Sequence, residues 1–88
     1  MKTKAHNLDI DIEHKVEASN GGLTVIKVSA VCGQTTHVHS ITVGAIDGKR
    51  PAPPTKQDLQ QMLDEGRNHA ANEAAWKESA RLAASQLS

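Results

Sequence analysis

Aromatic side chains are almost absent from this 88-residue sequence, which contains no Phe, no Tyr and only one Trp, Trp76. The hydrophobic core must therefore be built from Ile, Val, Leu and Ala, and each of these side chains removes less apolar area from water than an aromatic ring does. The sequence also lacks a set of aromatic rings on which unpaired bases could stack, which argues against a single-stranded nucleic-acid partner. We expect one small core in a single domain that spans residues 1–88.

Net charge is also absent, because 10 Lys and Arg residues balance 10 Asp and Glu residues. A neutral chain lacks the broad positive potential with which proteins bind nucleic acids and anionic membranes. No apolar run approaches the length of a membrane span, and the opening sequence MKTKAHNLDIDIEHK has no apolar segment of the kind found in secretion signals. We therefore expect a cytoplasmic protein with no nucleic-acid partner and no membrane partner.

The first half of the sequence has the patterns of β-strands. Residues 8–18 alternate between apolar and charged side chains, which predicts a half-buried strand. After the turn sequence SNGG, residues 23–32 (LTVIKVSAVC) and 37–46 (HVHSITVGAI) are rich in β-branched residues and predict two further strands. The expected result is a three-stranded antiparallel sheet within residues 6–47.

The register of the first two strands can also be predicted from the sequence. A three-residue loop over residues 20–22 makes the apolar sides of the two strands coincide, whereas a two-residue Asn-Gly turn would place polar residues opposite apolar ones. We therefore expect three cross-strand pairs: Val16 with Ile26, His14 with Val28, and Ile12 with Ala30.

The second half of the sequence predicts a long helix. Three prolines stiffen a connector over residues 48–54 and exclude a helix there. Thr55 then provides an N-cap, with Asp58 three residues later in an arrangement close to a capping box. Almost every residue from there to the end favours a helix, so we expect one over residues 55–87. Gly66 is the weak point of this helix.

An unbroken helix of this span would be about 48 Å long, whereas a ten-residue strand reaches about 33 Å. We therefore expect either a bend or break near Gly66 or a helix end that extends beyond the sheet. The predicted fold class is α+β, with a three-stranded antiparallel β-meander followed by a long C-terminal helix packed on one sheet face. The apolar residues of the helix form two stripes about a quarter circle apart: Leu59, Met62, Leu63, Gly66 and Ala70 in the first, and Trp76, Ala80, Ala83 and Leu87 in the second.

Several apolar residues remain uncovered in this arrangement. Leu23, Val25 and Val31 alternate with the residues that face the helix, so they point to the opposite side of the sheet. Such a surface fits a homodimer or a docking site for another protein, although isolated exposed aliphatic residues are also common on small domains. The candidate interaction surface consists of Leu23, Val25, Val31, Trp76, Ala80, Ala83 and Leu87.

The stretch CGQTTHVHS places the only cysteine, Cys32, near His37 and His39. A single cysteine cannot form an internal disulfide, which suits a reducing compartment. Cys and His are zinc ligands, and a Cys-His pair can act as a nucleophile, but a second cysteine, a CxxC motif and an orienting third residue are all missing. The alternative is a buried cysteine with histidines bonded to backbone or water.

Taken together, these patterns predict a small non-enzymatic module for protein interaction or assembly that associates with itself, without a cofactor. The competing hypothesis is a metal-binding or thiol-reactive module centred on Cys32, His37 and His39.

Overall fold

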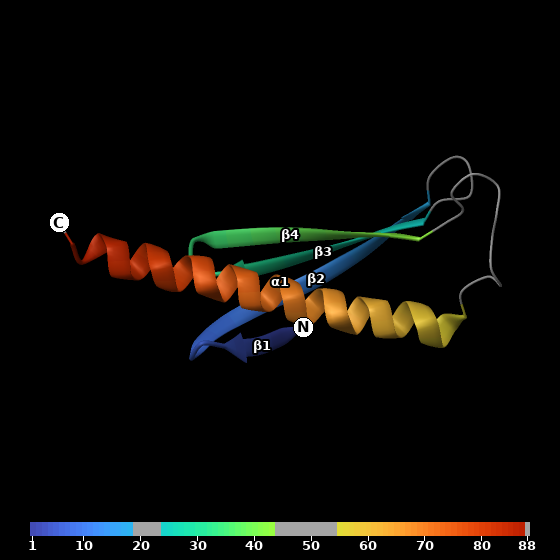
Figure 1. The fold of residues 1–88 in the computed structure, drawn as a ribbon, viewed down its shortest axis with the longest axis horizontal. Helices are drawn as coiled ribbons and strands as arrows, with labels where there is room; N and C mark the ends of the chain where they lie inside the picture. The colour runs from blue at the N-terminus through green and yellow to red at the C-terminus, as the bar shows by residue number, and fades with distance from the viewer. Residues whose placement is uncertain (19–23, 44–54, 88) are drawn as a thin grey trace.

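The computed structural model describes residues 1–18, 24–43 and 55–87, and it shows an antiparallel sheet crossed on one face by a long helix (Figure 1). The sheet has four strands in the order β1-β2-β3-β4, which is the order of a meander. The predicted α+β class is therefore confirmed, with one strand more than expected. The elements are β1 (Lys2–Ala5), β2 (Leu8–Ala18), β3 (Thr24–Cys32), β4 (Thr35–Val43) and α1 (Lys56–Ser85).

The additional strand is β1, which pairs with the first part of β2. His6 and Asn7 form the turn between them with φ values of 51° and 63°. Positive φ at both central residues is the requirement of a type I′ hairpin turn, and Asn and His adopt it more readily than most residues. The backbone N–H of Ile12 also donates to the carbonyl of Met1 at 2.8 Å. The sequence KTKA gave no strand signal because its Lys and Ala residues have low β-propensity.

The predicted register of the central hairpin is correct. Val16 pairs with Ile26, His14 with Val28 and Ile12 with Ala30. The next hairpin has a two-residue turn between Cys32 and Thr35, so β4 begins two residues earlier than expected. Residues 20–22, Leu23, the expected end of the third strand and the connector over residues 48–54 lie outside the described residues.

The expected capping box is present at the start of α1. Thr55 Oγ1 accepts from the Asp58 backbone N–H at 3.1 Å, and the Asp58 carboxylate accepts from the Thr55 backbone N–H at 2.9 Å. The helix then continues through Gly66 to Ser85, so the break that was one of the two alternatives near Gly66 is not observed. The alternative is what is observed, since the C-terminal end of the helix extends beyond the sheet (Figure 1).

Gly66 serves instead to bring the helix close to the sheet. A Cβ atom at this position would lie 2.6 Å from Ile41 Cδ1, which is inside the normal van der Waals distance of about 3.5–4.0 Å. The remaining buried residues of α1 are also small, apart from Leu63 and Glu78, and they pack against larger aliphatic side chains on the sheet. The core consists of Ile10, Ile12, Ile26, Val28, Ala30, Cys32, Leu63, Ala70, Ala71, Ala74 and Ala75.

The close approach at Gly66 predicts that Ala at this position has an effect that depends on residue 41. In an unobstructed helix interior, Gly→Ala stabilises by about 1 kcal/mol. In the wild-type background, Gly66→Ala should raise the free energy of unfolding by much less, because the Ile41 side chain must leave its rotamer to make room for the added methyl group. In an Ile41→Val background, which removes Cδ1, the same change should recover most of the gain. Urea unfolding of the four proteins measures both effects, and an equal gain in the two backgrounds would show that the contact does not limit the helix.

Candidate functional site

Val25 and Val31 are the expected interaction residues of the sheet that the structure describes, and they lie on its outer face, which is the face opposite α1. Val31 is 42% exposed, and Val38 on the neighbouring strand is 53% exposed. Val25 lies on the same face and is partly buried. The positions beside them across β3 and β4 are occupied mostly by Thr and Ser. This half of the outer face is therefore uncharged except at Lys27.

The other half of the outer face, over β1 and β2, is charged. Lys4 Nζ lies 3.7 Å from the Asp9 carboxylate, and Glu17 lies 3.5 Å from both Lys15 and Lys27. These pairs are well exposed and contribute little to stability. Their effect is to keep this half of the sheet hydrated, so the apolar part of the outer face is confined to β3 and β4.

The second half of the expected surface lies on the exposed side of α1 and, at Leu87, just beyond its end. Trp76 is 64% exposed, Leu87 is 89% exposed, and Ala80 and Ala83 are also exposed. Trp76 follows His69 by seven residues, which places the two side chains on the same side of the helix. Because the His69 ring contacts histidines of β4, this side of α1 is the one that borders β4.

The histidines of β4 are held against α1. The ring centroids of His39 and His69 are 4.6 Å apart, and those of His37 and His69 are 5.9 Å apart. Lys77 Nζ lies 3.0 Å from His37 Nδ1 and donates to it when the imidazole is neutral. Burial lowers the pKa of His37, and the positive charge of Lys77 lowers it further. The arrangement favours neutral His37 at physiological pH.

Cys32 does not have the surroundings of a reactive thiol. Its side chain is 1% exposed, and burial raises the pKa of the thiol, with a further increase from the negative charge of Glu78. A nucleophilic cysteine needs the opposite, a lowered pKa and access for the substrate. In the part of the chain that the structure describes, no three His, Cys, Asp or Glu side chains form a group that could hold a metal ion, and this includes Cys32, His37 and His39.

Glu78 was not predicted from the sequence to have a specific role, but the structure places it in a cluster of polar contacts. Its carboxylate is buried and accepts from the Gln34 backbone N–H at 3.2 Å, from the Thr35 hydroxyl at 3.1 Å and from Arg81. The Arg81 bond, with the bonds from Gln34 and Thr35, lowers the pKa of Glu78 to about 2. A Cβ at Gly33, where φ is 59°, would overlap Glu78 Oε2, so only Gly fits there. These contacts fasten the β3–β4 turn to α1.

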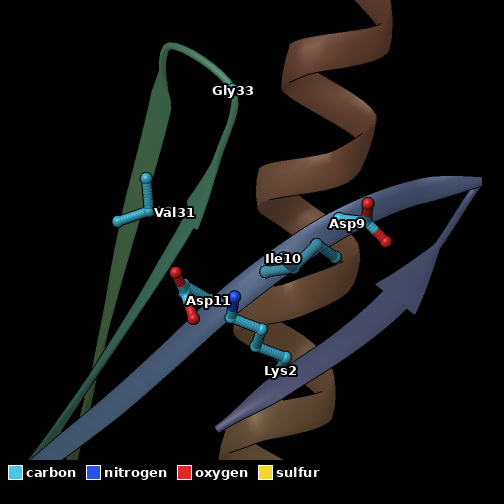
Figure 2. Close-up of a pocket in the computed structure, with 6 residues that line it drawn as sticks. All are labelled: Lys2, Asp9, Ile10, Asp11, Val31 and Gly33. Atoms are coloured by element: carbon cyan, nitrogen blue, oxygen red, sulfur yellow. The ribbon is translucent and has the colours of Figure 1, made fainter.

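A hollow of about 440 Å³ lies between β1, β2 and the end of β3. Figure 2 shows Asp9 and Asp11 at its wall, with Lys2 on the adjacent strand. In the ladder, Lys2 is the partner of Asp11 and Lys4 is the partner of Asp9. Each carboxylate therefore faces a cation of the same chain, as expected of a solvated strand face rather than a calcium site.

Comparison with known proteins gives no relative: no protein-family model matches the chain, and no curated protein or solved structure is significantly similar to it. Within the described residues, no helix combines the length and the apolar character needed to cross a membrane. The function must therefore be argued from the surface of the molecule itself.

The lowered pKa of Glu78 predicts a specific loss of stability in acid. A carboxylate whose pKa falls from 4.5 to about 2 on folding stabilises the native state above pH 4.5, and this contribution disappears as the pH falls toward 2. Glu78→Gln should therefore destabilise the protein near neutral pH, and the difference from wild type should shrink progressively in acid.

Urea unfolding at several pH values between 7 and 3 would measure this difference. Glu65→Gln, which removes an exposed carboxylate from the same helix, controls for the change in net charge. A constant difference between Glu78→Gln and wild type over the whole range would mean that the Glu78 cluster does not stabilise the charged carboxylate.

Proposed function

We propose that this chain is a small non-enzymatic interaction module that associates with a second copy of itself. The observation that carries the proposal is the position of Trp76, the only aromatic side chain of Phe, Tyr and Trp type in the sequence. It is 64% exposed, although a core of Ile, Val and Ala has few other large groups to bury. Trp is also the residue type most enriched among the residues that dominate binding energy in protein interfaces.

The surroundings of Trp76 support the same function. The part of α1 that carries Trp76 borders β4 on the inner face of the sheet. The uncharged surface with Val31 and Val38 borders β4 on the outer face. Exposed apolar side chains therefore border β4 from both sides, and the charged Lys77 and Glu73 lie near His37 on the α1 side. An interface with an apolar centre and a polar rim has this composition. A partner bound along β4 would cover Trp76 together with Val31 and Val38.

An enzymatic role has less support. The buried Cys32 thiol has a raised pKa, and the hollow beside Asp9 and Asp11 is lined by carboxylates that face lysines. Neither place combines an accessible nucleophile with a base and a donor for a developing charge. An interaction surface requires only shape and apolar area, which the β4 region provides.

Self-association predicts a concentration-dependent mass with a contribution from Trp76. Sedimentation equilibrium over a wide concentration range should show a monomer in dilute solution and a dimer at higher concentration. Trp76→Ala should raise the dissociation constant at least about tenfold, because truncation of a central interface Trp costs more than about 1.4 kcal/mol.

The matched control is Leu82→Ala. Leu82 is 39% exposed on the same helix but lies on the side away from β4, so its removal should change the dissociation constant by less than about threefold. The emission of Trp76 should also shift to shorter wavelength as the dimer forms. A monomer at every concentration, or an equal effect of the two substitutions, would overturn the proposal.

A further inference from the structure

The two edges of the sheet are protected to very different degrees. At one edge, β1 has only four residues and carries Lys2 and Lys4. Beyond β1, the same side of the sheet is continued by the part of β2 that carries Glu13, Lys15 and Glu17. Short strands and charged side chains are the features that prevent edge-to-edge pairing in natural sheets.

The opposite edge has none of these features. β4 is nine residues long, and its sequence TTHVHSITV contains no Lys, Arg, Asp, Glu or Pro. Its ladder with β3 is continuous from Thr35 to Val43, without a bulge that would twist the edge away. A long, uncharged and regular edge strand is a template for pairing with another strand.

The backbone groups available at this edge follow from the ladder. The residues that flank a two-residue hairpin turn, here Cys32 and Thr35, form a hydrogen-bonded pair, and such pairs alternate along an antiparallel ladder. Thr35, His37, His39 and later odd positions therefore bond to β3. The N–H and C=O groups that point away from β3 belong to Thr36, Val38, Ser40 and Thr42.

We propose that two copies of the chain pair antiparallel along β4, with His39 at the two-fold axis, and that the two sheets form one continuous sheet. This inference rests on the proposed self-association and names the surface and register that produce it. The combined sheet would have eight strands, four from each copy. Both α1 helices would lie on the same face of it.

This register is the one that pairs the whole of β4. His39 is the midpoint of Thr35–Val43, so an axis at His39 pairs every residue of one strand with a residue of the other. Val38 then faces Ser40 of the second copy, and Thr36 faces Thr42. The backbone N–H and C=O groups of these four residues, which point away from β3, would all gain hydrogen-bond partners. Between the two β4 strands, no two carboxylates and no two ammonium groups meet, because Thr35–Val43 contains no Asp, Glu, Lys or Arg.

The position of α1 determines how close the helices of the two copies would come. Near His69 the helix reaches both β4, through His39, and β2, through the 3.0 Å contact of Arg67 with His14, so its axis lies near β3, about one and a half strand spacings from the two-fold axis. With strands about 4.8 Å apart, the two helix axes would be separated by about 14 Å, which is more than the 8–10 Å of closely packed helices. Long side chains on the facing sides of the two helices would therefore fill the space between them.

The residues that meet between the helices follow from the same two-fold axis. His69 lies beside His39, so it marks the level of the two-fold axis on α1. Met62 and Trp76 are each seven residues from His69, in opposite directions. Because the helices run antiparallel, Trp76 of one copy faces Met62 of the other, a favourable sulfur–aromatic contact, whereas Glu73 of one copy faces Glu65 of the other, a like-charge contact. An unrelated strand would satisfy β4 but would leave Trp76 exposed.

A cysteine cross-link tests this arrangement. In the proposed pairing the two His39 residues form a non-hydrogen-bonded pair with Cα atoms about 4.5 Å apart, which is within the range of a disulfide. His39→Cys should therefore form a covalent dimer with oxidised glutathione as the oxidant. Thr36→Cys should remain monomeric on a non-reducing gel, because its two copies would be about 20 Å apart. The wild-type chain is the blank, since Cys32 is buried.

A second measurement does not depend on a substitution at His39. Spin labels attached at position 36 or at position 42 should report nearly equal distances between copies, because both positions are three residues from the axis. A dimer by sedimentation with unequal label distances and no His39→Cys cross-link would overturn the β4 pairing while leaving self-association intact. A monomer at every concentration would overturn both.

Discussion

The arrangement of this protein depends on how closely α1 can approach the sheet. The buried side of the helix consists mainly of Ala and Gly, including Gly66, Ala70 and Ala74, and these residues leave room for Ile and Val side chains from β2 and β3. Small residues bring a helix and a sheet together but bury little apolar area each, so most of the hydrophobic stabilisation comes from the sheet side. Because the buried side of α1 consists mainly of small residues, the larger apolar side chains of Trp76 and Leu87 lie outside the core.

A second contact fixes the helix along its length. Glu78 binds the turn after β3 through Gln34 and Thr35, and Gly33 provides the space for the carboxylate. A buried carboxylate is tolerated only because every lone pair direction has a donor nearby, including Arg81. Together with the Gly66 contact, this cluster holds α1 over β3 and β4. The helix side that carries Trp76 is thereby placed beside the edge of β4 that has no strand partner within the described residues, which is why the two apolar surfaces adjoin.

The sequence was sufficient to predict the fold class, the register of the central hairpin, the capping box and the exposure of Val31 and Trp76, because each depends on a local pattern or on strand alternation. It was not sufficient for β1, whose Lys-rich sequence has no strand pattern and is held by pairing with β2. The close approach of the helix to the sheet at Gly66 involves Ile41, and the role of Glu78 depends on a turn more than forty residues away. Contacts that are distant in sequence leave no periodic signal.

The proposed dimer requires that the outer edge of β4 is covered by β4 of a second copy. Residue-resolved amide hydrogen exchange tests it most directly, at one concentration below and one above the onset of dimer formation. The account predicts that the amides of Thr36, Val38, Ser40 and Thr42 exchange rapidly in the dilute sample and become protected in the concentrated one, whereas the amides of His37, His39 and Ile41 are protected in both. Rapid exchange of the first group in a sample that is fully dimeric would contradict it.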